Sequence, residues 1–451
     1  MNSLQFAATE EKTLIFVANL HTFYDLFASM GRFQGLIGIV LILGIAFLFS
    51  NNRSKINYRL VLSGIALQVL IGILVFKVPP VTWFFQQVGH AMGKLEAFAR
   101  QGAAFVYGGI GVSQPPTGTI ADYASGGFVF AFNVTATIIL VCVLVAVLYH
   151  FGIMQRVVAV IARAMNIIMR VSGAEALSNV ASAFVGQVEA QVMIRPYLSS
   201  MTKSELLASM SGSLACIAGG ILVVYANMGF QAGMDIAPFL ITASLMAAPG
   251  ALVISKIVFP ETEESVTMGR VKMEVKSNYT NVIDAISHGA GDGFKIAMNV
   301  IAMLIGFIAL IALLDWCLIH IGHIFNPNFD LSLDWIFGKL FTPMAWAMGV
   351  PTDDVSKVAT LLGQKLTINE FVAFKSLTSH KVEVVSPKAI AIVTIAIAGF
   401  ANFSSVGMQI GGIGELAPDR RSDLAKLGLK ALLCGTLASY LSATIAGILL
   451  G

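Results

Sequence analysis

Two glutamates lie within apolar segments of the 451-residue sequence, where an ionisable side chain could do chemistry. Glu189 lies two residues after Gln187, and Glu370 lies in a second, distant segment. An ionisable group at membrane depth costs free energy, so each marks a functional site by default. The alternative is a structural role, in which each glutamate pairs with a nearby base such as Arg195 or Lys365.

A third polar group follows a glycine in another apolar segment. Asn402, Ser404 and Ser405 come shortly after Gly399. A helix broken at this glycine would expose carbonyl and amide groups beside the three side chains. The alternative is that these side chains form hydrogen bonds between two helices.

The composition indicates which elements must position these groups. Hydrophobic residues make up 57% of the sequence and charged residues 12%, about half of the roughly 25% charge of a soluble protein. So little charge cannot cover a water-facing surface, and a polytopic membrane protein is predicted. The formal net charge of +3 argues against a nucleic-acid partner.

Other chemistries find no support in the sequence. The four cysteines have no CxxC spacing and predict neither a disulfide framework nor a metal site. The sequence contains no Walker, GxSxG or HExxH motif, so an ATP-driven pump or a hydrolase has no predicted catalytic residue.

Eight windows without Asp, Glu, Lys or Arg approach the length of about 20 residues that a membrane-crossing helix needs. They lie between Arg32 and Arg53, Arg59 and Lys77, Asp122 and Arg156, Glu205 and Asp235, Asp235 and Lys256, Lys295 and Asp315, Lys388 and Glu415, and from Lys430 to the end. The fold class predicted is therefore an all-α polytopic membrane protein with eight transmembrane helices.

Basic residues in short loops predict the orientation, because such loops stay preferentially on the cytoplasmic side. Arg53, Lys55 and Arg59 place the connection after the first span inside. Alternation then places every strongly basic connection on that face, namely those with Arg156, Arg163 and Arg170, with Lys256, Arg270, Lys272 and Lys276, and with Arg420, Arg421 and Lys426. Both termini are then outside, and the first 30 residues are predicted to form an interfacial lead-in.

Residues 171–204 and about 339–387 are too rich in charge to cross the membrane as helices, yet too apolar for plain loops. We predict that both are re-entrant. Each is followed by a span interrupted by glycine and then by a further span, so the same order of elements occurs twice. Similar motifs recur in it: the first copy contains Val185-Gly186-Gln187 and then Ile217-Ala218-Gly219, and the second contains Leu362-Gly363-Gln364 and then Ile397-Ala398-Gly399. The two copies enter from opposite sides, which is typical of an inverted repeat with a substrate site near the midplane.

Several motifs resemble the signature of the concentrative nucleoside transporters. They occur in the family's order, from the first span to the C-terminus. They are Gly186-Gln187-Val188-Glu189, Arg195-Pro196-Tyr197-Leu198, Met201-Thr202-Lys203-Ser204-Glu205-Leu206, Ala248-Pro249-Gly250, Pro260-Glu261-Thr262-Glu263, Asn281-Val282-Ile283-Asp284-Ala285, Gly363-Gln364-Lys365-Leu366, Asn369-Glu370-Phe371-Val372-Ala373, Gly399-Phe400-Ala401-Asn402-Phe403-Ser404-Ser405 and Ser442-Ala443-Thr444-Ile445-Ala446-Gly447.

The resemblance implies a bacterial-type nucleoside importer of the cytoplasmic (inner) membrane, working as a cation symporter and not as an enzyme. It implies interfacial helices, two re-entrant hairpins, a homotrimer and an elevator-like movement. The scaffold would comprise residues 1–125 with spans one and two, 126–170 with span three, and 261–335 with span six. The transport domain would comprise residues 171–260 with the first hairpin and spans four and five, and 336–451 with the second hairpin and spans seven and eight.

The resemblance also implies the substrate site. Gln187, Val188 and Glu189 in the first hairpin, with Ile221, would face the nucleobase, while Glu370, Asn402 and Ser405 would hold the ribose and Phe400 would lie against the ligand. These roles agree with the chemistry of the side chains. A carboxylate only accepts hydrogen bonds and can accept them from both hydroxyls of a vicinal diol.

The implied ion site departs from the family's pattern. Its side chains would be Ser182, Val188 and Cys216, and its carbonyls those of Val185 and Ile217. Sodium prefers oxygen ligands, whereas valine supplies none and a thiol is a poor substitute. We therefore expect the coupling cation to be a proton, since a carboxyl group removed from water could bind one. The alternatives are sodium at a remodelled site or uncoupled transport.

Other functions remain open at this point. A channel or receptor-like protein would bind nucleosides without accumulating them. A membrane-embedded enzyme would need a nucleophile and a base, and the sequence places no such pair. Modified nucleosides or nucleobases are alternative substrates. Nucleotides are disfavoured because phosphate calls for basic groups that the sequence does not place near Glu370 and Asn402.

Overall fold

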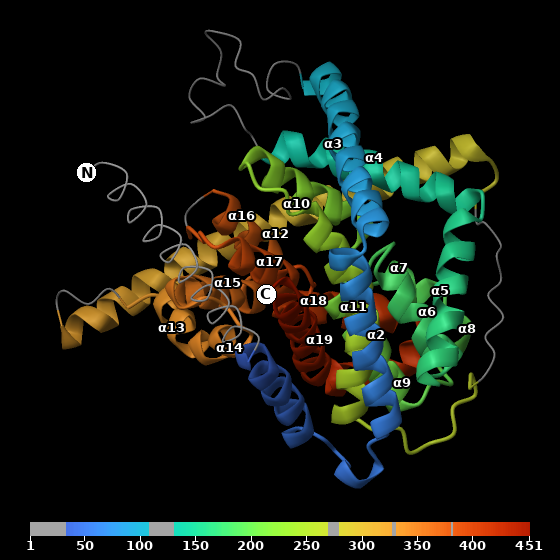
Figure 1. Cartoon of the computed structure of the whole chain (residues 1–451). Helices are drawn as coiled ribbons and strands as arrows, with labels where there is room; N and C mark the ends of the chain where they lie inside the picture. The colour runs from blue at the N-terminus through green and yellow to red at the C-terminus, as the bar shows by residue number, and fades with distance from the viewer. Residues whose placement is uncertain (1–32, 108–129, 269–278, 327–330, 380–381) are drawn as a thin grey trace, which may run out of the picture.

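The computed structural model describes residues 33–107, 130–268, 279–326, 331–379 and 382–451 (Figure 1). Within these residues the regular secondary structure is entirely helical. The predicted all-α architecture is therefore confirmed for this part of the chain. The predicted lead-in lies outside the described residues.

The helices follow one another in this order. An apolar helix at Phe33–Leu48 precedes η1 (Arg53–Lys55), α2 (Tyr58–Lys77), α3 (Pro79–Tyr107), α4 (Phe130–His150), α5 (Ile153–Met169), α6 (Gly173–Ser182), α7 (Glu189–Val192), α8 (Arg195–Leu198), α9 (Lys203–Ala215), α10 (Gly219–Gln231) and α11 (Ala237–Val258). The second part contains α12 (Val282–Phe325), α13 (Leu333–Leu340), α14 (Thr342–Ala347), η4 (Thr352–Asp354), α15 (Val355–Thr367), α16 (Glu370–Thr378), α17 (Pro387–Ile397), α18 (Phe403–Leu416), η5 (Pro418–Arg420) and α19 (Arg421–Leu450).

Helix is present in every charge-free window that the sequence predicts as a span. Among the described residues, four helical segments are long and apolar enough to cross a membrane, namely Tyr58–Lys77, Lys203–Gln231, Ala237–Val258 and Pro418–Leu450. In the third predicted span, α4 and α5 meet at a bend of 78°. Eight spans, re-entrant hairpins and the sidedness of the loops stay predictions.

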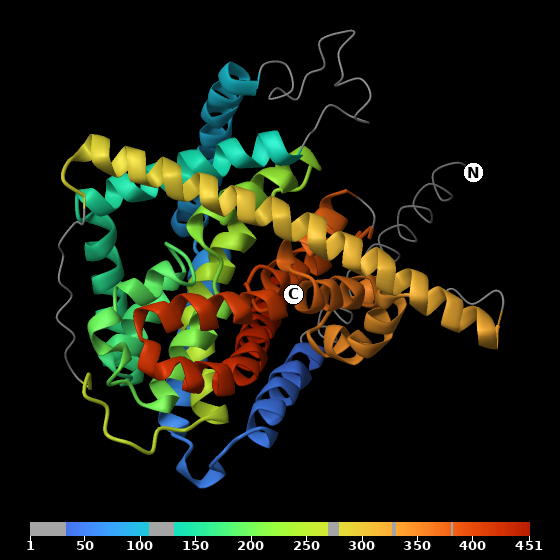
Figure 2. The ribbon, with the colours of Figure 1, turned by 180° about the vertical axis from the view of Figure 1, so that it is seen from behind.

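Helix α12 is the longest in the described part of the chain and runs across one face of the molecule. Figure 2 shows it extending beyond the other helices at its C-terminal end. It packs along α4. These two helices come from separate segments that the sequence assigns to the scaffold, residues 126–170 and 261–335, and the fold brings them together.

Two helices break, and their breaks touch one another. The first break separates α9 from α10 at Cys216, and the second separates α17 from α18 around Gly399. The backbone N–H of Phe400 donates to the carbonyl oxygen of Cys216 at 3.3 Å. Gly399 packs so closely on the end of α9 that a Cβ there would collide with the carbonyl oxygen of Ala215. Each break therefore supplies a partner for backbone groups that the other one frees.

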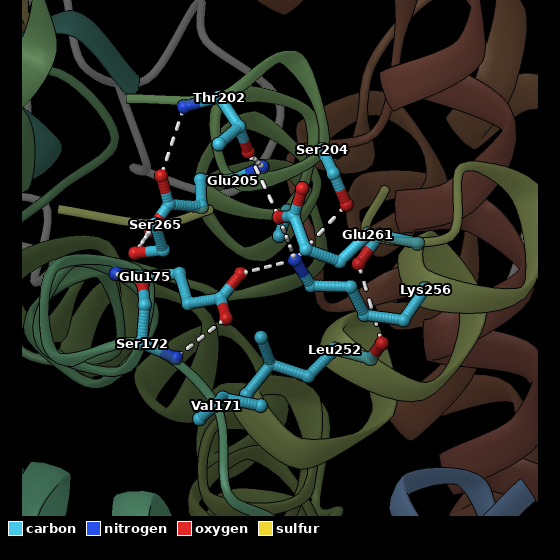
Figure 3. Close-up of polar contacts among 12 residues, drawn as sticks. Val171, Ser172, Glu175, Thr202, Ser204, Glu205, Leu252, Lys256, Glu261 and Ser265 are labelled. Atoms are coloured by element: carbon cyan, nitrogen blue, oxygen red, sulfur yellow. Dashed lines mark hydrogen bonds and ion pairs between the residues drawn. The ribbon is translucent and has the colours of Figure 1, made fainter. Parts of the chain in front are cut away.

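A buried ion cluster fixes the ends of three helices (Figure 3). Lys256 in the last turn of α11 pairs with Glu175 at 2.8 Å and with Glu261 at 3.3 Å, and it donates to Ser204 Oγ at 3.0 Å. Glu175 and Glu205 lie in the first turns of α6 and α9, where the positive ends of the helix dipoles favour carboxylates. Breaking a buried pair on one side leaves an uncompensated charge, so α6, α9 and α11 are held together at this end.

The contact between the two breaks predicts the effect of a single methyl group. We expect Gly399→Ala to destabilise the folded protein by about 1–3 kcal/mol, because backbone atoms cannot move aside as a flexible side chain would. The measurement is the thermal unfolding of the detergent-purified protein.

Gly407→Ala in α18 is the matched control. A Cβ at Gly407 would meet no atom within 4 Å, and alanine favours a helix interior more than glycine by about 1 kcal/mol. Equal stability of Gly399→Ala and the wild type would show that the breaks are not in contact.

Candidate functional site

Glu370 lies at the centre of the candidate site. It is the first residue of α16, and its side chain is only 7% exposed. Its Oε1 accepts a hydrogen bond from Tyr225 Oη at 3.1 Å, and its Oε2 accepts one from Asn402 Nδ2 at 2.9 Å. The carboxylate thus joins the second hairpin to α10 and to the second helix break. Both of these bonds come from neutral donors rather than from a lysine or an arginine.

Asn402 connects this carboxylate to the start of α18. Its Oδ1 accepts hydrogen bonds from the backbone N–H of Ser405 and from Ser404 Oγ, both at 2.8 Å, while its Nδ2 donates to Glu370. The side chain therefore caps the helix and orients the glutamate at once. The three polar residues identified in the sequence act as one capping unit.

Tyr225 is a residue of this site that the sequence analysis missed. It is fully buried, and its ring stacks on Phe374 with centroids 4.3 Å apart and an interplanar angle of 23°. Stacking fixes the ring so that the hydroxyl reaches Glu370. An isolated tyrosine in an apolar helix gives no sequence signal for this role, because its partner lies 145 residues away in the chain.

The first hairpin turns at Gly186, which has a φ of +148°. A Cβ at this position would also collide with the carboxylate of Glu189, which folds back over the turn. The side chain of Glu189 is exposed within this chain. Its carboxylate therefore lies at the surface of the hairpin tip, next to the turn at Gly186.

Helix α18 also contacts the tip of the first hairpin. Gln187 Nε2 lies 3.9 Å from Met408 Sδ, and a Cβ at Gly412 would lie 2.7 Å from Cγ1 of Val188. Met408 and Gly412 follow Asn402 by six and ten residues, or about 9 and 15 Å along a helix. One helix therefore contacts Glu370 through its cap and the first hairpin through its next turns. The Oε1 atom of Gln187 is buried without a hydrogen-bond partner among the described residues.

The two remaining predicted substrate residues lie at the helix breaks. Ile221 is in the first turn of α10, and Phe400 lies between α17 and α18. Both side chains are half-buried. The predicted substrate residues thus come from the first hairpin, the start of α10, the start of α16 and the second break.

The predicted ion site is occupied by internal hydrogen bonds. Ser182 Oγ donates to the carbonyl oxygen of Ser178 at 2.7 Å and lies 2.8 Å from Ser213 Oγ. The thiol of Cys216 donates to the carbonyl oxygen of Asn179 at 3.7 Å. Val188 packs on Gly412. The side chains at these positions therefore do not supply the set of oxygen ligands that sodium prefers. The carbonyl oxygens of Val185 and Ile217 stay predicted ligands.

A buried polar network, also missed by the sequence analysis, continues from this point. Gln191 Nε2 donates to Ser213 Oγ at 2.9 Å, and Ser209 Oγ donates to Gln191 Oε1 at 2.7 Å. All three residues are buried. The network fixes α7 of the first hairpin against α9.

Comparisons with known proteins agree with this architecture. The family models "Na+ dependent nucleoside transporter N-terminus", "Nucleoside recognition" and "Na+ dependent nucleoside transporter C-terminus" match residues 37–110, 131–231 and 239–447. The structure of CNTnw in an inward-facing substrate-bound state is similar, with a TM-score of 0.85 and 39% identity, covering 93% of this chain and 97% of that one. The class is therefore a polytopic helical membrane transporter and not an enzyme.

Sequence relatives narrow the class to a family. The chain is 36% identical to nucleoside permease NupC of Helicobacter pylori, over 92% of this chain and 97% of that protein. It is also 36% identical to sodium/nucleoside cotransporter 1 of Mus musculus, over 91% of this chain and 63% of that protein. This chain belongs to the concentrative nucleoside transporter family, which confirms the resemblance seen in the sequence.

The polar network predicts how the first hairpin responds to the loss of one side chain. Gln191→Leu removes both hydrogen bonds: the buried hydroxyl of Ser209 loses this partner, whereas the hydroxyl of Ser213 keeps that of Ser182. We expect the folded protein to lose about 1–3 kcal/mol per group left unsatisfied. The measurement is again thermal unfolding of the purified protein.

Gln86→Leu provides the control, because Gln86 is an exposed residue of α3. A melting temperature unchanged by Gln191→Leu would show that the network does not hold the hairpin.

Proposed function

We propose that this chain is a secondary active transporter that imports nucleosides across a bacterial cytoplasmic membrane by symport with protons. The observation that carries the proposal is the buried carboxylate of Glu370, whose two oxygens are held by Tyr225 and Asn402. The carboxylate lies where the second hairpin, α10 and the break before α18 meet. Family membership supports the nucleoside as substrate.

Glu370 and Asn402 provide the chemistry for ribose. An ionised carboxylate has acceptor sites beyond the two used by Tyr225 and Asn402, and it can accept from two vicinal hydroxyls. Bonds to an ionised acceptor are stronger than neutral ones. Ser405 is the third residue proposed to bind the ribose, and its backbone N–H is held by the side chain of Asn402.

Gln187, Glu189, Val188 and Ile221 provide the surface for the nucleobase. The amide of Gln187 offers both donors and an acceptor, and its Oε1 atom has no hydrogen-bond partner among the described residues. Val188 has no hydroxyl, so its side chain can offer the base only apolar contact. Phe400, at the second break, would lie against the ligand.

The residues of the predicted ion site favour a proton over sodium as the coupling cation. Two of the three side chains supply no hard oxygen ligand, and the hydroxyl of Ser182 is already hydrogen-bonded to Ser178 and Ser213. Carboxyl groups in the chain can bind a proton instead. Sodium coupling at a remodelled site, uncoupled transport, and transport of modified nucleosides or nucleobases are the alternatives.

The fold supports movement of a transport domain against a scaffold. Residues 171–260 and 336–451 are joined by the contact of the two breaks, and within the first segment the Lys256 cluster holds three helix ends. We propose that these residues move together past the scaffold, which includes α4 and α12. A homotrimer with the termini outside is the assembly proposed for this movement.

The ribose role of Glu370 predicts a selective loss of affinity. We expect Glu370→Gln to cost about 1.5–3 kcal/mol of binding free energy, or roughly 10- to 150-fold in Kd for a ribonucleoside, because hydrogen bonds to a charged acceptor are lost. The loss should be smaller for a 2′,3′-dideoxynucleoside. The measurement is isothermal titration of the purified protein.

Glu383→Gln changes the same functional group at an exposed position and serves as the control. Equal losses for the ribo- and dideoxynucleoside would remove Glu370 from the ribose site.

The ion-site residues predict which gradient drives uptake. In proteoliposomes, we expect an inward proton gradient to drive accumulation of radiolabelled nucleoside above the external concentration, and an inward sodium gradient at equal pH to have no effect. Accumulation driven by sodium alone would contradict the proposed coupling. Equilibration without accumulation would indicate a channel or an uncoupled carrier.

The triple variant Ser182→Asn, Val188→Thr and Cys216→Ser tests the same point in the opposite direction. Val188→Thr and Cys216→Ser supply the side-chain oxygens that this chain lacks, and Ser182→Asn replaces a short oxygen ligand by a longer one. We expect nucleoside uptake by the triple variant to become dependent on sodium. Cys434→Ser, at a buried thiol elsewhere, is the control.

A further inference from the structure

Lys365 differs from every other buried charged residue in the described part of the chain. The others take part in a hydrogen bond or an ion pair, and they are Glu175, Glu205, Lys256, Asp354 and Glu370. The Nζ atom of Lys365 has no hydrogen-bond partner among the described residues, although its side chain is 0% exposed. Burying an unpaired ammonium ion costs several kcal/mol, and a neutral amine avoids that cost.

The position of Lys365 relates it directly to the proposed substrate carboxylate. Lys365 lies in the last turn of α15, and Glu370 is the first residue of α16. The negative end of the α15 dipole favours a cation, and the positive end of the α16 dipole favours an anion. The two side chains interact electrostatically. A positive charge on Lys365 would therefore be compensated mainly by Glu370.

The contacts of the two residues fit a neutral amine beside an ionised carboxylate. Glu370 receives hydrogen bonds from Tyr225 and Asn402, so it is stabilised as an anion without the lysine. Lys365 Nζ lies 5.9 Å from the ring centroid of Tyr440 in α19, at the outer limit of a cation–π contact. The amine of Lys365 can therefore bind a proton, but none of its described contacts needs the amine to be charged.

Few other ionisable groups are available to this amine. Tyr440 faces it from α19 and Glu370 from α16. The other ionisable residues of α15 and of the elements packed on it are Lys357 in α15, Lys375 in α16, Asp334 and Lys339 in α13, Lys388 in α17, and Asp353 and Asp354 in η4, with none in α14. Asp334 Oδ1 accepts from Gln364, and Asp354 pairs with Lys357.

We propose that Lys365 carries the coupling proton, being a neutral amine in the substrate-free transporter and an ammonium ion when Glu370 holds the ribose. This inference rests on the proposed proton symport. A proton from the outer solution adds to the lone pair of Nζ, crosses with the nucleoside, and leaves to the inner solution after the nucleoside is released. One proton thus crosses with each nucleoside, and no bond of the substrate changes.

Substrate binding can be coupled to this protonation by the exclusion of water. In a site open to solution, water would screen the charge of Glu370, which is only 7% exposed in the described structure. A bound nucleoside displaces that water, and the attraction between opposite charges grows as the local dielectric constant falls. The filled and closed site therefore favours the ammonium form, in which the buried pair has no net charge.

Proton uptake by the purified protein tests the proposal directly. We expect uridine or adenosine to take up one proton per nucleoside bound in weakly buffered detergent solution. Lys365→Met, which keeps an unbranched side chain without the amine, should reduce this ratio to zero while nucleoside still binds. Lys339→Met, at an exposed position in α13, should keep the ratio of the wild type.

Transport in proteoliposomes provides the second readout. Lys365→Met should exchange labelled for unlabelled nucleoside across the membrane but lose accumulation driven by a proton gradient. Lys365→Arg keeps a permanent charge, because the guanidinium does not lose its proton. This variant should bind nucleoside and show no proton-driven accumulation. If Lys365→Met fails to bind nucleoside, Lys365→Arg still tests whether Lys365 carries the coupling proton.

The outcomes separate this inference from the proposed function. Proton-driven accumulation by Lys365→Met or Lys365→Arg at the wild-type proton ratio would overturn the role of Lys365 and leave proton symport intact. A wild type that accumulates nucleoside without proton uptake would overturn proton symport itself, and the role of Lys365 with it.

Discussion

The structure depends on one constraint, which is that backbone groups freed by a broken helix inside a membrane must find partners within the protein. Here the two broken helices meet at their breaks, and Phe400 N–H donates to the carbonyl oxygen of Cys216. Gly399 permits the close approach, and Asn402 caps the helix that follows. The break of one helix is thus stabilised by the break of the other.

The contact between the two helix breaks also explains why the candidate site combines residues from both halves of the chain. The cap residue Asn402 holds Glu370 of the second hairpin, while Met408 and Gly412 of the same helix contact the first hairpin. Helix α18 spans both contacts and so sets the spacing of the proposed ribose and nucleobase groups. The family's transport function is consistent with a site to which α18 connects both of the predicted hairpins.

Two buried lysines show how the same residue type can serve different purposes. Lys256 is surrounded by Glu175, Glu261 and Ser204, so its charge is compensated and it ties helix ends together. Lys365 has Glu370 and the ring of Tyr440 as neighbours, and its Nζ atom has no hydrogen-bond partner in the described part of the chain. This difference in surroundings is why we propose a coupling role for Lys365 and a structural role for Lys256.

The sequence alone determined the features that depend on local composition. Each charge-free window located helix, Gly399 and Gly219 marked the two breaks, and the cost of a buried charge identified Glu370. Only the tertiary structure decided which groups meet. The hydroxyl of Tyr225, the link from Gln191 to α9 and the burial of Lys365 all depend on segments distant in the chain, and hydropathy and helical periodicity carry no information about such pairings.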